Sequence, residues 1–393
     1  MKNNRVALIA RSPFPFGDVC TVRYSTYCKA LANEGVFTKV YILHPSKSPE
    51  AKSNRNTRGV YDGVHFEYLS TDTYWTASTL SVKKQLLYMY YVLKSLFLLR
   101  KDGINVIILY HHDNFNTIIY RIFCSLFNIL FLTDQTEFPY KFPYNSDEFN
   151  NISKYLKKIH FCSFDKYIVM THSLHEYYCH FLNKNKDLFF HLPMTVDLDR
   201  FKNIEELSSE PSYIACVFGV HNRDCIFDTI KSYKLYVDNK DDAWTLNLYG
   251  DFYKLKIANE LLLYIKNNQL ENKVIIKGKI ISIDMPKILT NAKCLITTAR
   301  EYVSGGFPTK LGEYLATRKP IVATKAGEIP RYLEDGISCF LATPGDIEEI
   351  AWKLLYVHDN YNEALCVAER GYIIAKNNFN AEKSIQELIN FFD

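Results

Sequence analysis

Residues 294–330 read CLITTAREYVSGGFPTKLGEYLATRKPIVATKAGEIP, and this stretch decides the fold. It begins with a short apolar run that predicts a strand at 294–297, and a glycine pair then bends the chain. A helix is predicted to begin near Thr309, and a second apolar strand follows at 321–324. Short, continuously apolar strands connected through helices are typical of parallel sheets covered on both faces. The stretch therefore predicts an α/β fold.

The same alternation of strand and helix extends over the whole chain. Further strands are predicted at 5–10, 39–43, 63–69, 105–110, 128–133, 165–170, 213–218, 245–249, 273–276 and 339–342. A chain of 393 residues exceeds one ordinary core and suits two domains of about 100–200 residues each. With right-handed crossovers, the predicted fold class is α/β with two doubly wound Rossmann-like domains facing each other across a cleft.

The boundary between the domains is expected at LPMTVDLDRF, residues 192–201, which has proline and closely spaced acids but little helical periodicity. The predicted organisation is an N-terminal Rossmann-like domain at 1–192, a connection at 193–210, a C-terminal Rossmann-like domain at 211–375 and a last helix at 376–393. That helix could pack on either domain. A polar patch at Lys47–Arg58 predicts a mobile surface loop.

The bulk properties narrow the class of protein. A formal net charge of +4 is small for 393 residues, which argues against a nucleic-acid partner that needs a strong positive field. The ten cysteines form no CxxC pair, and this pattern indicates reduced, cytosolic, mostly buried thiols. The apolar stretches 85–99 and 118–132 contain Lys94 and Arg121, and neither reaches the ~20 apolar residues of a spanning helix. With no signal-peptide pattern, we expect a cytoplasmic protein.

The glycine pair and the helix after it offer groups that suit a diphosphate. Gly305 and Gly306 permit close approach of the backbone to a ligand. The N–H groups that open the helix at Thr309, together with Lys310, suit an anion. Glu313, one turn further along, can accept hydrogen bonds from the vicinal hydroxyls of a ribose. A tight turn, a solvated lysine and an acid that suits the helix dipole form the alternative interpretation, and local chemistry leaves both open.

Four segments, in order, resemble the retaining glycosyltransferases of family 4. The run GFPTKLGEYLATRKPIVATKAGEIP at 306–330 resembles their nucleotide-sugar segment, in the variant of polysaccharide and lipopolysaccharide members. RVALIARSPFPFGDVCTVRYSTYCKALANEG at 5–35 resembles the first strand, glycine-bearing loop and helix, LPMTVDLDRF the interdomain connection, and PGDIEEIAWKLLYVHDN at 344–360 the terminal region. The resemblance implies the GT-B fold and transfer of a sugar from a nucleotide diphosphate sugar to a glycan or lipid-linked acceptor. It also implies retention of configuration and no metal or other cofactor.

The resemblance assigns a role to Glu313. This residue corresponds to the second glutamate of the family's paired-glutamate motif, which contacts the donor ribose. The first glutamate, expected eight positions earlier, is replaced by Gly305. This departure puts the donor-sugar contacts in doubt, and Lys310 or Glu301 could compensate.

The family also has basic residues after the first strand of its second domain, where they neutralise the diphosphate. Here this region reads FGVHNRDCIF at 218–227. Arg223 fits the position of a lysine, whereas Val220 stands where an arginine is often found. His221 could substitute for the missing base, although a histidine in such a loop is more often solvent-exposed.

The first domain supplies candidates on the acceptor side. His111 and His112 follow the predicted 105–110 strand, where an imidazole can hydrogen-bond a sugar hydroxyl or the transferring group. At least one of the two is expected to cap the next helix or to be exposed. Gly17 would let its loop approach the donor phosphate or the acceptor, or is simply a turn residue. Glu137 could face the acceptor, although a loop carboxylate is usually solvated.

The apolar helix expected at 82–100 also carries Lys83, Lys84, Lys94 and Arg100. This combination is compatible with peripheral contact on an anionic membrane, where lipid-linked acceptors reside. A buried helix in the core explains the composition as well and is favoured.

Two rival functions stay open. A nucleotide-sugar epimerase would use the same pair of domains with acid and base carboxylates and no acceptor, and a non-catalytic binding subunit is suggested by Gly305 and Val220. Asp197 and Asp199 have the spacing of a metal-binding Asp-x-Asp, but they lie in the connection, so no metal site is predicted. No GxGxxG or P-loop motif occurs, which weakens oxidoreductase and P-loop hypotheses.

Overall fold

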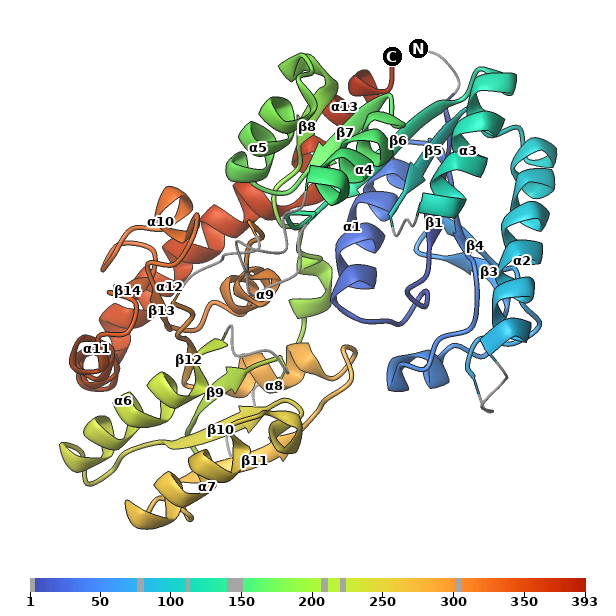
Figure 1. Ribbon diagram of the computed structural model, residues 1–393. Helices are drawn as coiled ribbons and strands as arrows, with labels where there is room; N and C mark the ends of the chain where they lie inside the picture. The colour runs from blue at the N-terminus through green and yellow to red at the C-terminus, as the bar shows by residue number, and fades with distance from the viewer. Residues whose placement is uncertain are drawn as a thin grey trace. The chain divides into compact units, whose positions relative to one another are not determined.

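The computed structural model describes residues 4–75, 81–110, 114–139, 151–205, 211–219, 224–300 and 305–393 (Figure 1). The chain divides into two compact units. Unit 1 consists of Met1–Thr195, Ser304–Gly306 and Ala381–Asp393, and unit 2 consists of Val196–Val303 and Phe307–Asn380.

Unit 1 contains an eight-stranded sheet with the order β3-β4-β2-β1-β5-β6-β7-β8. Its strands are β1 (Arg5–Ala10), β2 (Phe37–Ile42), β3 (Arg58–Tyr61), β4 (Val64–Tyr68), β5 (Val106–Leu109), β6 (Leu130–Gln135), β7 (Lys166–Val169) and β8 (Phe189–His191). Neighbouring strands are parallel except β3, which pairs antiparallel with β4 at the edge. The four residues of β5 are all buried, as expected for a central strand covered on both faces.

Helices cover both faces of this sheet. They are α1 (Val19–Asn33), α2 (Ser81–Lys101), α3 (Asn114–Phe127), α4 (Asn151–Cys162), α5 (His172–Leu182) and α13 (Ala381–Phe391), with the short turns η1 (Pro49–Ser53) and η3 (Lys186–Leu188). Helices α2, α3, α4 and α5 contact one another in that order, whereas α1 packs against α13. From β1 the sheet grows toward one edge through β2 and toward the other edge through β5 to β8. Right-handed crossovers therefore put α1 on one face of the sheet and the helices that connect β5 to β8 on the opposite face.

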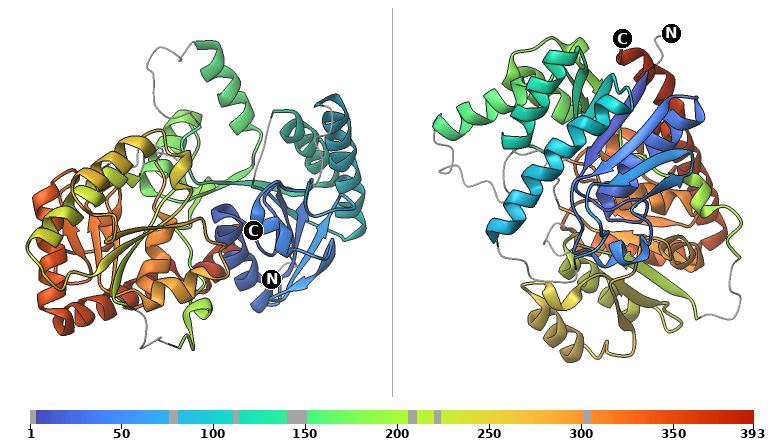
Figure 2. Two further views of the ribbon diagram at one scale, coloured as in Figure 1. Left: turned by 90° about the horizontal axis from the view of Figure 1, so that it is seen from below. Right: turned by 90° about the vertical axis from the view of Figure 1, so that its right-hand side faces the viewer.

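The last helix completes the core of unit 1. Ile385 and Leu388 of α13 are buried in one cluster with Val6 and Leu8 of β1. Figures 1 and 2 show this helix, in dark red, beside the blue N-terminal elements. The helix whose packing the sequence leaves open therefore belongs to unit 1.

Unit 2 contains a six-stranded sheet with the order β11-β10-β9-β12-β13-β14, parallel throughout its described pairs. Its strands are β9 (Tyr213–Val217), β10 (Thr245–Tyr249), β11 (Val274–Gly278), β12 (Cys294–Thr297), β13 (Ile321–Thr324) and β14 (Phe340–Ala342). Its helices are α6 (Ile226–Asp238), α7 (Ala258–Asn267), α8 (Met285–Asn291), α9 (Thr309–Ala316), α10 (Ile329–Tyr332), α11 (Ile347–Asp359) and α12 (Tyr361–Ile374). The segments η4 (Leu198–Phe201) and η6 (Phe252–Lys254) are short 3-10 helices, and η7 (Ala375–Phe379) is π-helical.

The predicted fold class, two doubly wound α/β domains, is confirmed. The expectation of a mobile loop over Lys47–Arg58 is wrong for its central part, which forms η1. Hydrogen bonds of Asn54, just after η1, connect this part to the loop after β1. The Asn54 side chain there is buried, accepts the N–H of Phe16 at 3.0 Å and donates to the Phe16 carbonyl at 2.7 Å. Within the described part of the chain, no helix combines the length and apolarity needed to cross a membrane.

Candidate functional site

The candidate site of unit 2 lies at the carboxyl ends of β9 and β12, beside the start of α9. In open parallel sheets this edge is where ligands bind, because the loops and helix N-termini converge there. Pro308 precedes α9, so the helix begins without a side-chain cap. The first N–H groups of a helix lack intrahelical partners and favour anions. The predicted position of Thr309 at the helix start is confirmed.

Lys310 points from the first turn of α9 to the end of β9. Its ammonium group donates to the carbonyl of Val217 at 2.9 Å and forms an ion pair with Asp224. The two side chains are only 16% and 13% exposed, so this lysine is held in place rather than solvated at random. The interpretation of Lys310 as a freely solvated lysine is therefore wrong.

Asp224 lies just before α6 and contacts residues of two other elements through its carboxylate. Its Oδ2 atom accepts the backbone N–H of Gly219 at 2.7 Å, while its Oδ1 atom pairs with Lys310. The hydroxyl of Thr298, just after β12, donates to the Asp224 carbonyl at 3.1 Å. One carboxylate thus connects the end of β9, the start of α6 and the first turn of α9.

Glu313 lies one turn after Lys310 and is partly buried. Its Oε1 atom accepts a hydrogen bond from Nη1 of Arg200 at 2.7 Å, and Arg200 also donates to the Ser282 carbonyl. A carboxylate has about four lone-pair sites on two oxygens, so this pairing leaves acceptor capacity for the hydroxyls of a ribose. Arg200 lies on η4 and fixes the orientation of the Glu313 carboxylate.

A second arginine lies at the same edge of the sheet. Arg300 follows β12 and forms a bidentate pair with Asp228 of α6, with distances of 2.8 Å and 2.9 Å. Asp228 is 7% exposed and the Arg300 side chain 60% exposed. This pairing raises the pKa of Arg300 further above its ordinary value, so a positioned and permanent positive charge stands at the surface of the site.

Tyr314 fastens α9 to β9. Its hydroxyl oxygen accepts the N–H of Val217 at 2.8 Å, and the side chain is fully buried. Burial raises the pKa of Tyr314 well above its ordinary value, so this group serves as a neutral structural contact. It holds Lys310 and Glu313, its neighbours on the helix, at a fixed distance from the strand end.

Gly305, the position of the missing glutamate, is constrained by its surroundings in unit 1. Its φ is +75°, and an added Cβ atom would lie 2.6 Å from the ring of Phe138. Its carbonyl accepts the hydroxyl of Thr171 at 2.6 Å. A glutamate here would face both backbone strain and a clash. Gly306 is buried and groups with unit 1.

The acceptor-side candidates in unit 1 have separate surroundings. Gly17 is buried, and an added Cβ atom would lie 2.0 Å from the Thr21 hydroxyl and 2.4 Å from the Pro13 carbonyl. Close packing within its own loop therefore requires glycine there. Glu137 is exposed, and its carbonyl accepts the Tyr178 hydroxyl at 3.3 Å. His111, His112 and Arg223 lie outside the described residues.

Sequence reasoning missed three contributors to the site of unit 2: Arg200, Asp224 and Arg300. Arg200 and Asp224 lie 113 and 86 positions away from their partners in the sequence, so pairing was not visible from spacing. Asp224 and Arg300 each follow a predicted strand of the parallel sheet, and that position was the available signal.

Comparisons with known proteins agree with this fold. Residues 212–360 match the family model described as "Glycosyl transferases group 1". A curated trehalose phosphorylase of Pleurotus pulmonarius is 43% identical over 49 residues, a match that covers 12% of this chain and 7% of that protein.

Several solved structures are similar over nearly the full length. A glycosyltransferase from Rickettsia africae has a TM-score of 0.73 at 15% identity, covering 100% of this chain and 98% of that chain. Sucrose-phosphate synthase from Thermosynechococcus elongatus has a TM-score of 0.74 at 13% identity, covering 99% and 98%. HepE from Anabaena in complex with UDP has a TM-score of 0.69 at 15% identity, covering 98% of each chain. Residues 212–360 are therefore similar to the glycosyl transferases group 1 domain, and the chain as a whole has the two-domain GT-B fold.

Proposed function

We propose that this protein transfers a hexose from a nucleoside diphosphate sugar to a glycan or lipid-linked acceptor, with retention of configuration and without a metal ion. We further propose a role in the synthesis of cell-surface polysaccharide or lipopolysaccharide. The observation that carries the proposal is the pair Lys310 and Glu313 on α9, which lies inside the segment that matches the family model. Asp224 holds Lys310, and Arg200 holds Glu313. The UDP complex of the similar HepE structure supports a nucleotide as ligand.

In this mechanism the chain acts mainly by electrostatics. Breaking the bond between sugar and diphosphate leaves negative charge on the leaving group, and preorganised cations and N–H groups stabilise such charge. Lys310 and the start of α9 would contact the diphosphate, and Arg300 would add a positive charge at the same edge. Glu313 would accept hydrogen bonds from the ribose. Arg223, His111 and His112 stay predictions for phosphate binding and for contacts with the transferring group.

Isothermal titration calorimetry with UDP and UDP-glucose tests the site. We expect Lys310→Met and Glu313→Gln each to weaken binding by about 10-fold or more, because each removes a charge-assisted contact. Lys266→Met and Glu260→Gln are matched controls, since both residues are exposed on α7 of the same unit and should leave affinity unchanged. If neither Lys310→Met nor Glu313→Gln changes the affinity for UDP and UDP-glucose, the assignment of the donor site is contradicted.

Product analysis separates transfer from the two rivals. An epimerase converts a nucleotide sugar alone into a new nucleotide sugar, whereas a transferase gives at most slow hydrolysis until an acceptor is present. Incubation with a crude lipid-linked acceptor pool should produce a glycosylated lipid. Donor binding without any turnover would support the non-catalytic subunit instead.

The structure also supports contact with an anionic membrane surface through unit 1. Helices α2, α3 and α4 expose large apolar side chains at helical spacing on their outer faces: Leu86, Met89, Tyr90, Leu93 and Phe97 on α2, Phe115, Ile118, Ile122, Leu126 and Phe127 on α3, and Tyr155, Leu156 and Ile159 on α4. Exposed Arg100 lies over the Phe127 ring at 4.6 Å, and Lys101 is also exposed. Contiguous apolar surface with basic side chains is typical of interfacial helices.

The favoured sequence interpretation of α2 as a buried core helix is therefore incomplete, because only one face of it is buried. Phe97 and Leu126 are 71% and 74% exposed. We expect the protein to float with liposomes that contain anionic lipid, and the double variant Phe97→Glu and Leu126→Glu to lose flotation. Exposed Tyr253 of unit 2 gives the control Tyr253→Glu. Self-association of the protein without flotation would mark the surface as an interface between copies and contradict the membrane proposal.

A further inference from the structure

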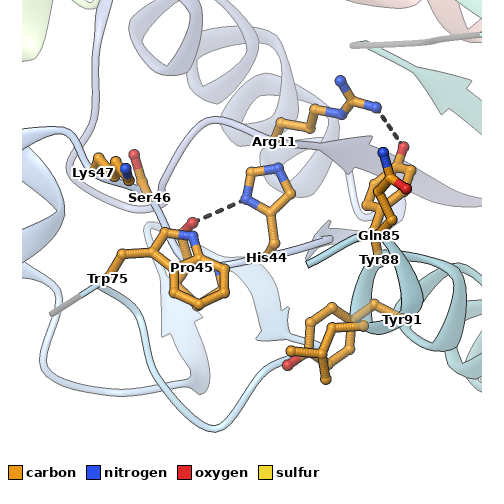
Figure 3. A pocket seen from close by; sticks show the side chains of 10 residues that line it. Arg11, His44, Pro45, Ser46, Lys47, Trp75, Gln85, Tyr88 and Tyr91 are labelled. Atoms are coloured by element: carbon orange, nitrogen blue, oxygen red, sulfur yellow. Dashed lines mark hydrogen bonds between the residues drawn. The ribbon is translucent and has the colours of Figure 1, made fainter. Parts of the chain in front are cut away.

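Unit 1 contains a second candidate site that neither the sequence interpretation nor the donor site includes. It is a pocket of ≈ 470 Å³, within the range of about 300–1,000 Å³ that is common for small-molecule sites. Its walls come from the loops after β1 and β2, from Trp75 and from α2 (Figure 3). The side chains that matter for the argument are Arg11, His44, Lys47, Trp75, Tyr88 and Tyr91.

The location of this pocket is that of a ligand site. Arg11 directly follows β1, and His44 lies two residues after β2. The two strands are parallel neighbours, with Ala10 opposite Ile42 at their ends. The pocket therefore opens at the carboxyl edge of the sheet, where doubly wound folds bind ligands.

The basic groups of the pocket are held in position. Nη2 of Arg11 donates to the Tyr88 hydroxyl at 2.5 Å, and its guanidinium carbon lies 4.8 Å from the centre of the same ring. The Tyr88 hydroxyl also accepts a hydrogen bond from Asn116 at 2.7 Å, which ties it to α3. Because these contacts fix the guanidinium, less conformational entropy is lost when an anion binds.

His44 contributes a ring nitrogen whose hydrogen-bonding role depends on the protonation of the imidazole. Its Nδ1 atom lies 2.9 Å from the Pro45 carbonyl, which can only accept, so Nδ1 carries the hydrogen and Nε2 is the second hydrogen-bonding atom. Nε2 accepts when the ring is neutral and donates when it is protonated. Figure 3 shows the imidazole in the middle of the pocket wall, with Arg11 on one side and Trp75 on the other.

The aromatic wall is built on hydrogen-bonded backbone. The N–H of Trp75 donates to the Ser46 carbonyl at 3.0 Å, and the N–H of Ser46 donates to the Thr73 carbonyl at 3.1 Å. Trp75 and Tyr91 thus present ring surface from a fixed frame. The C–H face of a pyranose is apolar and packs favourably on such rings.

We propose that this pocket binds a sugar residue that carries an anionic group, a phosphate or a carboxylate. Arg11 and Lys47 bind the anion, His44 binds it or an adjacent hydroxyl, and Trp75 and Tyr91 pack on the ring. The pocket lining includes the basic side chains of Arg11 and Lys47. Anions bind such groups through charge-assisted hydrogen bonds, so a charged sugar is favoured over a neutral one. The role of this sugar as the acceptor rests on the proposed transferase function.

Calorimetry with small probes tests the proposal on the full chain. Glucose 6-phosphate and glucuronate supply the two anions, glucose is the neutral sugar, and inorganic phosphate is the anion without a sugar. We expect both charged sugars to bind at least 10-fold more tightly than glucose and than phosphate. Arg11→Gln should remove most of this preference, and Lys47→Gln part of it.

The controls separate binding from folding and from the donor site. Lys186→Gln removes the same charge from an exposed position on η3 and should bind like the unaltered chain. Lys47 is exposed, so Lys47→Gln reports on the pocket even if Arg11→Gln unfolds. Equal affinity for glucose and the charged sugars, or for phosphate and glucose 6-phosphate, would overturn the proposal. Because none of these probes is a nucleotide, this failure is distinct from loss of UDP binding, which would overturn the donor site.

Discussion

The ammonium group of Lys310 and the carboxylate of Asp224 form an ion pair that joins α9 to the loop after β9. Both side chains are more than four-fifths buried, so removal of one partner leaves the other poorly solvated. We expect Lys310→Met and Asp224→Asn each to lower the melting temperature, and the double variant to lose less than the sum. Double-mutant cycles for contacting residues give coupling of about 0.5–3 kcal/mol. Additive losses in urea unfolding would show that the pair contributes no coupling.

Arg200 is expected to act on nucleotide affinity through Glu313. Arg200→Met leaves the Glu313 carboxylate without the 2.7 Å contact that orients it, so we expect the Kd for UDP to rise by about 3- to 10-fold, as for the loss of one charged hydrogen bond. Lys202→Met, two positions further along the chain, is the control, because the Lys202 side chain is 65% exposed. If both variants bind UDP equally well, Arg200 has no positioning role.

The buried pair of Arg23 and Asp134 should govern the stability of unit 1. The guanidinium binds both carboxylate oxygens at 2.9 Å and 3.0 Å and also donates to the Leu192 and Pro193 carbonyls. Arg23→Met leaves the Asp134 carboxylate buried without its partner, which lowers the free energy of unfolding by about 3–5 kcal/mol.

The double variant Arg23→Met and Asp134→Asn should recover part of this loss. Lys29→Met on the same helix removes a looser contact of 3.9 Å and should cost under about 1 kcal/mol. If Lys29→Met and Arg23→Met lower the melting temperature equally, the central role of the buried pair is contradicted.

Gly305 and Gly35 give a matched test of why the glutamate is missing. Both have positive φ, +75° and +78°, but an added Cβ meets the Phe138 ring at Gly305 and open space at Gly35. Gly35→Ala should cost about 1–2 kcal/mol of backbone strain, and Gly305→Ala should cost about 1–3 kcal/mol more for the clash. Thermal unfolding of the two variants measures the difference. A stable Gly305→Glu variant with improved donor affinity would contradict the steric explanation.

Binding of glucuronate in the unit 1 pocket should strengthen as the pH falls. Burial, together with the nearby Arg11, lowers the pKa of His44, so the free ring is neutral at pH 7. A bound carboxylate favours the protonated ring and raises this pKa, so the complex takes up a proton and low pH favours binding. The other charged or titratable side chains that line the pocket are Arg11, Lys47, Tyr88 and Tyr91.

The readout is the affinity for glucuronate at pH 7.5 and 5.5, with proton uptake measured in buffers of different ionisation heat. His44→Gln should abolish the pH dependence and keep the preference for a charged sugar. An affinity for glucuronate that does not change with pH would exclude His44 from contact with the anion.

The buried strands were the most predictable part of the fold. The runs at β1, β10, β12 and β13 match their predicted limits, because each is rich in the apolar and β-branched residues that strands favour. The sequence did not show β3 and β8. All four residues of β3 are exposed, and β8 has only three residues, so neither has the apolar pattern that identifies a strand.

The site was predictable only in part, for a physical reason. Lys310 and Glu313 were identifiable because they lie one helical turn apart after a strand, which is a local pattern. Their partners Asp224 and Arg200, and the pairing of Arg11 with Tyr88, depend on which elements become neighbours in space. The outer face of α2 was ambiguous because a helix that is apolar on most sides does not show from sequence which side faces the sheet.

The packing of α13 on α1 sets an order of events during synthesis. The ribosome delivers β1 before unit 2, but the cluster that buries Val6 and Leu8 also includes Ile385 and Leu388, which emerge after unit 2. The strands and helices of unit 2 are all made in between. Nascent unit 1 therefore lacks one wall of its core throughout the translation of unit 2, and a chain released before residue 381 has no helix to cover the apolar side chains that α13 covers.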